Sequence, residues 1–494
     1  MANVAEAGTR GETRVKTVQQ HIDEVPIWAD GTTLLSTPMT GMQWFIWSLA
    51  AAGKFFEGFV VFMTGVALPL FSSEFGLGPA EHGVIGAASL FGILVGAVGL
   101  GGLSDRFGRK TMFVAEMIIF CAFLALLCVA QGYIQVVIFL FGLGLALGCD
   151  YPTAHMIISE TIPSSSRGKL VRGAFAFQAV GALGGTAVGF AVLSALPDIT
   201  AWRWMYASAI IPAVLVTLGR LYIVESPNWL SVRGETRKAE QAVKKLLVRK
   251  PQYPSDVKLA QRGQPSTTAK SDHSYAALFN SANRRATILA SVPWFLQDLG
   301  TYGIGIFTPT ILAAALGGNS DHARSVHDLI LNDITAAKGA ALITSLLIVG
   351  ILFAVMLADV VGRIWLQIVG FIGCAAGLFL ASLSGNFTGG AQTLLIFAGF
   401  MLFNFMTNLG PNAQTYLLAG EVFPTAIRGK GAGFAAAFAK IGAVMTAFLF
   451  PVLLDTIGTQ ALLYCLIVTS ILGAAITWAF RIETTGVSLE TLGH

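Results

Sequence analysis

The chain has 494 residues, of which 54% are hydrophobic and 12% are charged, with a net charge of +4. That charged share is about half of the share in soluble globular proteins, so it excludes a soluble protein of two or three domains. The five cysteines lie inside apolar runs and lack the spacing of metal ligands, so we expect neither a metal site nor a cofactor.

About twelve apolar runs are long enough to cross a membrane as helices, which takes roughly 20 residues each. We therefore expect an all-α membrane protein. A polar segment at 225–285 separates two six-helix halves at 42–224 and 286–481, and residues 1–41 and 482–494 form tails. The predicted spans are 44–70, 83–104, 111–130, 133–159, 171–196, 203–224, 286–315, 339–359, 364–384, 392–418, 431–456 and 460–480.

The basic residues predict the orientation of the chain. If both termini face the cytoplasm, 25 of the 31 Lys and Arg residues fall on the cytoplasmic side, as the positive-inside rule requires. We therefore interpret the basic segment 225–285 as a cytoplasmic linker and not as a nucleic-acid-binding region. We expect a plasma-membrane or inner-membrane protein that contacts lipid and no nucleic acid.

Two cytoplasmic loop motifs occur once in each half. An Asp-x-x-Gly-Arg turn follows the second span and again the eighth, and a Glu-x₆-Arg pair enclosing a proline follows the fourth span and again the tenth. Their order and spacing predict two halves related by an axis along the membrane normal. We expect these charges to have gating or structural roles; they are Asp105, Arg109, Glu160, Arg167, Asp359, Arg363, Glu421 and Arg428.

Ionisable side chains inside membrane spans cost at least roughly 2.5–3.5 kcal/mol each, so they mark function or pair with a partner. Glu116 and Arg220 lie near span ends or lipid-facing stretches, where snorkelling or a structural pair explains them as well as function does. In the seventh span, Trp294, Asp298 and Tyr302 follow at intervals of four and share one helix face. The other candidates among the ionisable residues within spans are Lys54, Glu57, Asp150 and Lys440.

The loop Gly-Gly-Leu-Ser-Asp-Arg-Phe-Gly-Arg-Lys at 101–110 resembles the signature of the major facilitator superfamily, and Glu-Ser-Pro-Asn-Trp-Leu at 225–230 resembles a sugar-porter motif. Asp-Tyr-Pro at 150–152 in the fourth span, the seventh-span stripe and Gly-Pro-Asn at 410–412 in the tenth resemble fungal and plant phosphate:proton symporters. This resemblance implies alternating access and a proton-coupled phosphate site. The implied substrate-binding residues are Tyr151, Gln178, Trp294, Asp298, Tyr302, Asn412 and Lys440, and the resemblance implies a proton-coupling role for Asp150. Because Glu57, Asp150 and Asp298 are carboxylates in apolar spans, we expect all three to take part in proton coupling.

The first span departs from the phosphate symporters, which carry Asp-x-x-Asp where this chain has Glu57 and Val60. It resembles bacterial metabolite:proton symporters instead, so a sugar, a sugar acid or an aromatic or organic acid is an equally open substrate. A membrane nutrient sensor is a third reading, which the short tails disfavour. We find no motif of a metalloprotease, an ATPase or a serine hydrolase, so we expect a transporter and not an enzyme. One chain supplies both halves of the pathway, so a monomer suffices.

Overall fold

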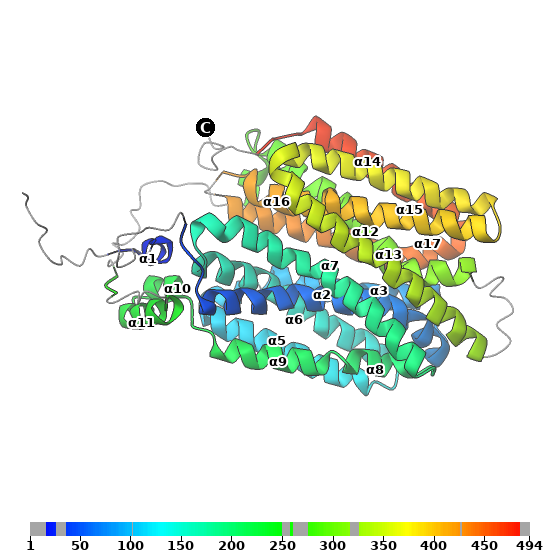
Figure 1. Ribbon diagram of the computed structural model, residues 1–494, viewed down its shortest axis with the longest axis horizontal. Coiled ribbons are helices and arrows are strands. Elements are labelled where there is room, and N and C mark those ends of the chain that lie inside the picture. Colours follow the sequence, from blue (N-terminus) through cyan, green and yellow to red (C-terminus); the bar gives the residue numbers. More distant parts are fainter. Residues whose placement is uncertain are drawn as a thin grey trace, which may run out of the picture.

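The computed structural model describes residues 16–25, 36–100, 102–248, 257–259, 275–316, 326–424 and 427–484; the rest of the predicted tails and linker lies outside these ranges. The described residues are mainly helical (Figure 1). The helices are α1 Val18–Asp23, α2 Gly41–Phe75, α3 Pro79–Val95, η1 Gly96–Leu100, α4 Leu103–Phe107, α5 Arg109–Cys128, α6 Tyr133–Thr161, α7 Ser164–Ala195, α8 Ala201–Ala207, α9 Ile210–Tyr222, α10 Pro227–Val232, α11 Thr236–Leu246, η2 Tyr275–Phe279, α12 Arg284–Leu316, α13 Val326–Val361, α14 Arg363–Ser382, η4 Leu383–Asn386, α15 Gly390–Leu409, α16 Pro411–Glu421 and α17 Arg428–Ala479.

Each of the twelve predicted spans has a helical counterpart. Ten helical stretches of the described chain are long and apolar enough to cross a membrane. One of them, α17, is interrupted at Gly458, whose backbone is not helical, and so it supplies two predicted spans. The helix α12, with 33 residues, supplies the seventh predicted span. The prediction of an all-α membrane fold with twelve spans is confirmed.

The helices form two groups of six spans that run side by side in Figure 1. The first group runs from α2 to α9 and the second from α12 to α17. Across the boundary between them, α12 packs on α2, α3 on α17 and α7 on α13. The interior of the bundle is therefore lined by helices from both halves, as the sequence repeat predicts.

Two predicted spans are each divided into two shorter helices. The sixth span divides into α8 and α9, and the tenth divides into α15 and α16 at Gly410, which Pro411 follows. The backbone of Gly410 has φ −110° and ψ −99°, which lies outside the helical region. Because proline lacks an N–H and disfavours a helical residue before it, the helix restarts at Pro411. This break lies next to the predicted site residue Asn412.

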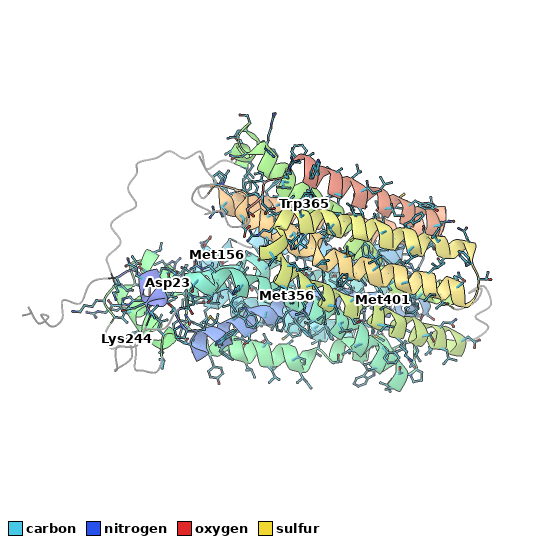
Figure 2. The ribbon with its side chains drawn as sticks, turned by 45° about the horizontal axis from the view of Figure 1, so that its top comes forward. Asp23, Met156, Lys244, Met356, Trp365 and Met401 are labelled. Carbon is cyan, nitrogen blue, oxygen red and sulfur yellow. The ribbon has the colours of Figure 1, made fainter. Side chains whose placement is uncertain are left out.

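The described parts of the N-terminal tail and of the linker pack together at the end of the bundle where α2 begins and α17 ends, here called the linker side (Figures 1 and 2). Apolar residues of α1, among them Val18 and Ile22, are buried with Val243 and Leu246 of α11. The N–H and hydroxyl of Ser164 donate to Asp23 at 2.7 and 2.8 Å, which ties α1 to the start of α7.

The pKa of Asp23, which lies outside the membrane spans, reflects this contact. Partial burial acts to raise the pKa, but the hydrogen bonds from Ser164 and Gln19 and the nearby charge of Arg167 lower it below the ordinary aspartate value. The carboxylate form therefore favours attachment of the tail to the first half.

On the opposite side of the bundle the two halves meet through backbone contacts at glycines. A methyl group at Gly65 of α2 would lie 2.1 Å from the carbonyl oxygen of Ile306 in α12. A methyl group at Gly83 of α3 would likewise lie 2.1 Å from the carbonyl oxygen of Phe448 in α17. These positions have no room for a side chain, so the halves are closed against each other on this side.

Candidate functional site

A buried carboxylate in α2 joins the two halves. Glu57 lies one turn after Lys54, and the Lys54 ammonium group is 2.6 Å from its Oε2. Its other oxygen, Oε1, lies 3.4 Å from the ammonium group of Lys440 in α17. Gln178 of α7 and Tyr302 of α12 also donate to Oε1, at 3.3 and 3.5 Å. One carboxylate therefore contacts two cations, one from each half.

The second half contributes Lys440, whose ammonium group also contacts two residues of α12. It donates to the hydroxyl of Tyr302 at 2.6 Å and lies 3.8 Å from Oδ2 of Asp298. Asp298 and Tyr302 are four residues apart on α12, so the helix places both on the face that meets α17. The side chains of Glu57 and Asp298 are almost completely buried, which makes each charge dependent on its partners.

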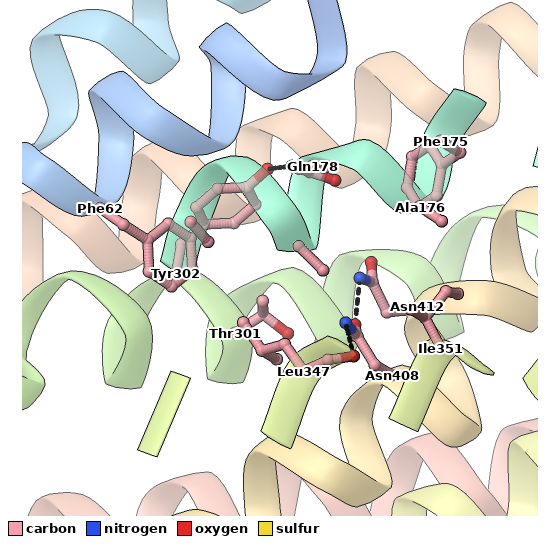
Figure 3. Close-up of a pocket in the computed structure, with 12 residues that line it drawn as sticks. Phe62, Phe175, Ala176, Gln178, Thr301, Tyr302, Leu347, Ile351, Asn408 and Asn412 are labelled. Atoms are coloured by element: carbon pink, nitrogen blue, oxygen red, sulfur yellow. Dashed lines mark hydrogen bonds between the residues drawn. The ribbon is translucent and has the colours of Figure 1, made fainter. Parts of the chain in front are cut away.

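A pocket beside this charge network is lined by side chains from both halves (Figure 3). Gln178 Nε2 donates to the Tyr302 hydroxyl at 3.1 Å, and Asn412 Nδ2 donates to Asn408 Oδ1 at 2.6 Å. The polar groups are thus amides, a phenol and the hydroxyl of Thr301, which are suited to binding oxygen atoms of a solute. The lining residues are Phe62, Phe175, Ala176, Gln178, Ala179, Ala182, Thr301, Tyr302, Leu347, Ile351, Asn408 and Asn412.

Four aromatic side chains connect the halves on the linker side of this pocket, and we call them the aromatic group: Tyr151, Phe175, Trp294 and Tyr416. The ring of Tyr416 in α16 stacks on Phe175 of α7 with centroids 4.6 Å apart and planes 15° apart. Tyr151 and Trp294 meet Tyr416 edge to face, at 6.3 and 6.1 Å. The contact closes the space between α7 and α16.

The structure brings most of the predicted substrate residues together. Gln178, Asp298, Tyr302 and Lys440 belong to the network around Glu57, and Asn412 lines the pocket. Tyr151 and Trp294 reach the site as members of the aromatic group. Two contributors were missed by sequence reasoning: Phe175 and Tyr416. Lys54 was named as an intramembrane charge but was given no role at the site.

Asp150, a predicted proton-coupling residue, contacts a different cation. Its Oδ1 lies 2.5 Å from Nη1 of Arg220 in α9, and Glu116 Oε2 lies 3.8 Å from the same nitrogen. Arg220 is fully buried and Glu116 is 2% exposed. Arg220 lies near the end of α9, as expected, and the two residues form the structural pair that the sequence left open. The alternative that they face lipid or snorkel is wrong, because both side chains are buried. The arginine also covers the ring of Phe113, 3.4 Å from its centroid, which fixes it between α5, α6 and α9.

The loop charges of the first half form one cluster at the linker side. Arg109 pairs with Asp105 at 2.7 Å and with Glu160 at 3.1 Å. Glu225 accepts the N–H of Lys110 at 3.0 Å, and the hydroxyl of Ser226 donates to Glu160. These contacts hold the ends of α5, α6 and α9 together within one half.

The second half repeats this cluster. Arg363 lies 3.1 Å from Glu421, which also accepts the hydroxyl of Thr484 at 2.7 Å. Glu483 accepts the N–H groups of Arg363 and Ile364 at 3.3 and 3.4 Å. Glu483 and Thr484 thus take the same places in the second half as Glu225 and Ser226 take in the first half. Sequence reasoning did not detect this correspondence.

Two predicted gating residues lie outside these clusters, and the side chain of a third is not described. Arg167, in the first turn of α7, acts electrostatically on Asp23. Arg428 donates its Nε to the carbonyl of Phe423 at 3.1 Å. Asp359 lies in α13, but its side chain is outside the described residues. Within the described part of the chain, no cluster of three or more His, Cys, Asp or Glu could hold a metal ion.

Comparisons with known proteins agree on the kind of protein. The family model for "Sugar (and other) transporter" matches residues 46–493. The inner membrane metabolite transport protein YgcS of Escherichia coli is 30% identical over 440 residues, covering 89% of this chain and 91% of that protein. The repressible high-affinity phosphate permease of Neurospora crassa is 26% identical over 436 residues, covering 81% of this chain and 75% of that protein.

Among solved structures, the inward-open conformation of the xylose transporter XylE from E. coli superposes with a TM-score of 0.72 at 21% identity. That match covers 91% of this chain and 99% of the other, and it confirms the major facilitator fold. The chain therefore belongs to the family of sugar and other transporters within the major facilitator superfamily.

Proposed function

We propose that the chain is a proton-coupled symporter of a small anion, with inorganic phosphate as the first substrate to test. The observation that supports this proposal is the position of Lys440, whose ammonium group contacts Tyr302 and lies within 4.0 Å of Glu57 and Asp298. An ammonium group that lies beside two carboxylates in a buried site becomes available to a substrate anion when one of those carboxylates takes up a proton.

The charges of the network explain how a proton and an anion can bind together. Lys54 and Lys440 balance Glu57 and Asp298 when all four are ionised. A proton on either carboxyl group leaves the site with one net positive charge, which suits a monoanion such as dihydrogen phosphate. Because an unpaired charge is costly away from water, each of the two ligands favours binding of the other. Glu57 and Asp298 are therefore our proton-coupling residues.

The polar groups around Lys440 suit an oxyanion. Tyr302, Gln178, Asn412 and the indole N–H of Trp294 are hydrogen-bond donors, and phosphate offers acceptor oxygens on every face. The similarity to a phosphate permease supports the same substrate. Asp150 lies outside this group, beside Arg220, so in our proposal it acts on protons without contacting the substrate.

Alternating access follows from contacts between the halves. Glu57 in the first half and Lys440 in the second make one ion pair across the central site. The glycine contacts close one side and the aromatic group closes the other. Uptake requires these two closures to open in turn while the halves rock about the site. The charge clusters at Arg109 and Arg363 keep each half rigid during that motion.

An organic carboxylate is the second candidate substrate, and the aromatic group favours it. Tyr151, Phe175 and Tyr416 offer flat apolar surface beside the cations, which phosphate does not need and a sugar acid or aromatic acid can use. The similarity to a metabolite transport protein supports this reading.

We further propose that the protein lies in the plasma or inner membrane with both termini in the cytoplasm and works as a monomer. The distribution of Lys and Arg supports the orientation, because the described part of the basic linker lies at the end of the bundle where α2 begins and α17 ends. On this orientation the glycine contacts close the extracellular side and the aromatic group closes the cytoplasmic side.

The test is uptake of radiolabelled phosphate into proteoliposomes with an imposed inward proton gradient. We expect saturable, protonophore-sensitive accumulation by the wild type and by Lys245→Gln, an exposed control on α11, and none by Lys440→Gln. Labelled glucuronate and xylose are tested alongside phosphate. Accumulation of glucuronate alone would select the organic-acid reading, and accumulation of xylose alone would refute anion transport.

A further inference from the structure

Lys54 is a second, largely buried cation at the site, and it contacts the aromatic group as well as Glu57. Its ammonium group is 2.6 Å from Glu57 and 3.7 Å from the centroid of the Tyr151 ring. The ring of Phe175 lies 5.8 Å away on the same side. Lys54 therefore stands where the charge network meets the aromatic group, held by an ion pair and by a cation–π contact.

Charge balance accounts for two lysines beside two carboxylates, Glu57 and Asp298, but it does not explain why both lysines contact the same carboxylate. Glu57 already has Lys440 at 3.4 Å and hydrogen bonds from Gln178 and Tyr302. A second buried ammonium group adds a desolvation cost that one carboxylate repays only in part. Such a cost is understandable if the second cation has another partner during the transport cycle.

The exposure of the four charged side chains indicates which groups an incoming ligand meets. The side chains of Lys54 and Lys440 are 12% and 13% exposed, whereas those of Glu57 and Asp298 are 4% and 3% exposed. The two cations are thus the more accessible of these four charged side chains, and the two carboxylates are the more deeply buried. An anion that enters the site can therefore reach the ammonium groups more readily than the acids.

We propose that Lys54 and Lys440 form a two-lysine clamp for the substrate anion, one lysine from each half, and that the Glu57 carboxylate occupies the clamp when the site is empty. This inference rests on the proposed function and narrows its substrate class. The two oxygens of Glu57 each contact one lysine, and two oxygens of a phosphate or of a substrate carboxylate can replace them.

The clamp selects anions over neutral solutes. A neutral sugar cannot replace Glu57 as the partner of two cations, so its binding would leave the network intact and gain only hydrogen bonds. An anion takes over the lysines while Glu57 accepts a proton, so the site stays near neutrality. The exchange also links the halves, because the anion bridges Lys54 of α2 and Lys440 of α17 in place of the carboxylate.

The test is equilibrium binding of labelled phosphate and labelled glucuronate to the purified full-length protein. The variants are Lys54→Gln, Lys54→Arg, the double variant Lys54→Gln/Glu57→Gln, and the exposed control Lys245→Gln. Losing one charge-assisted contact should weaken anion binding at least about tenfold in Lys54→Gln. Lys54→Arg should recover part of this loss, and the control should match the wild type. A thermal unfolding midpoint for each variant shows that it is folded.

The double variant separates a substrate contact from a structural ion pair, because it removes both partners and keeps the net charge of the site. If Lys54 served only to neutralise Glu57, the double variant would bind anions as the wild type does, and that result would overturn the clamp. Continued weak binding by the folded double variant is the expected result. Anion binding that is unchanged in Lys54→Gln would refute the clamp and leave anion transport standing. A wild type that binds neither anion would refute both.

Discussion

Gly65 offers a direct way to open the side of the bundle opposite the linker. In the structure, a methyl group at this position would lie 2.1 Å from the carbonyl oxygen of Ile306, well inside the 3.4 Å at which ordinary contact begins. The neighbour is backbone in the middle of α12, so no side-chain rotation relieves the clash. Gly65→Ala therefore requires α2 and α12 to separate by about 1 Å, and it destabilises only the state in which they touch.

The size of the expected shift between conformations follows from the free-energy cost of overpacking. Forcing a methyl group into a well-packed contact costs about 1–3 kcal/mol. Applied to one of two conformations, this cost shifts their ratio about 5- to 150-fold toward the state that is open on the glycine side. Gly433→Ala is the matched control, because a methyl group there meets nothing within 4 Å.

The assay is a distance distribution between spin labels at Ala80→Cys and Asn386→Cys, exposed positions in the two halves on that side, with the five native cysteines replaced by serine. We expect Gly65→Ala to move population to longer distances and Gly433→Ala to leave it unchanged. Identical distributions for Gly65→Ala and the wild type, in folded protein, would refute the idea that glycine contacts set this closure.

Further predictions concern the unfolding free energy of variants and the rate of amide hydrogen exchange. Arg220→Gln leaves two buried carboxyl groups without their cation and should lower the unfolding free energy by about 3–5 kcal/mol, seen as a fall in the thermal midpoint; no fall would contradict the buried cluster. Gly108 and Gly362 have φ +104° and +94°, so alanine at either should cost about 1 kcal/mol or more, and a cost at only one would argue against equivalent clusters in the two halves. Asp23→Asn should speed hydrogen exchange in α1 about two- to fivefold at pH 7, a modest effect because the carboxylate faces solvent. Since the pKa of Asp23 is lowered in the folded protein, its contribution is present above the ordinary aspartate value and is lost as the pH falls through the lowered value. The wild type should therefore approach the variant in acid, and a constant difference down to pH 2 would refute the assignment.

The sequence was sufficient to predict the twelve spans and the two halves, because membrane burial imposes long apolar runs and because loop motifs recur. It also identified Asp298, Tyr302 and Lys440, since ionisable and phenolic groups stand out in apolar helices. The repeat was only partly visible. Glu483 and Thr484 take the positions of Glu225 and Ser226, but no flanking motif marks them.

What could not be predicted depends on contacts between distant helices. Arg220 looked like a span-end residue, and its burial against Asp150 depends on how α9 packs on α5 and α6. Tyr416 and Phe175 are ordinary aromatic residues in their own helices and become a closure only where α7 and α16 meet. Lys54 was visible as an intramembrane charge, but its place between Glu57 and Tyr151 required the positions of two helices.

Proton coupling through the central site is the main claim of this account, and Asp298→Asn tests it most directly in proteoliposomes loaded with phosphate. The variant keeps a side chain of similar shape and removes the proton-binding group; Asp455→Asn, exposed on α17, is its control. We predict that Asp298→Asn still exchanges labelled for unlabelled phosphate but no longer accumulates phosphate when an inward proton gradient is imposed. Accumulation equal to that of the wild type and the control would contradict the account.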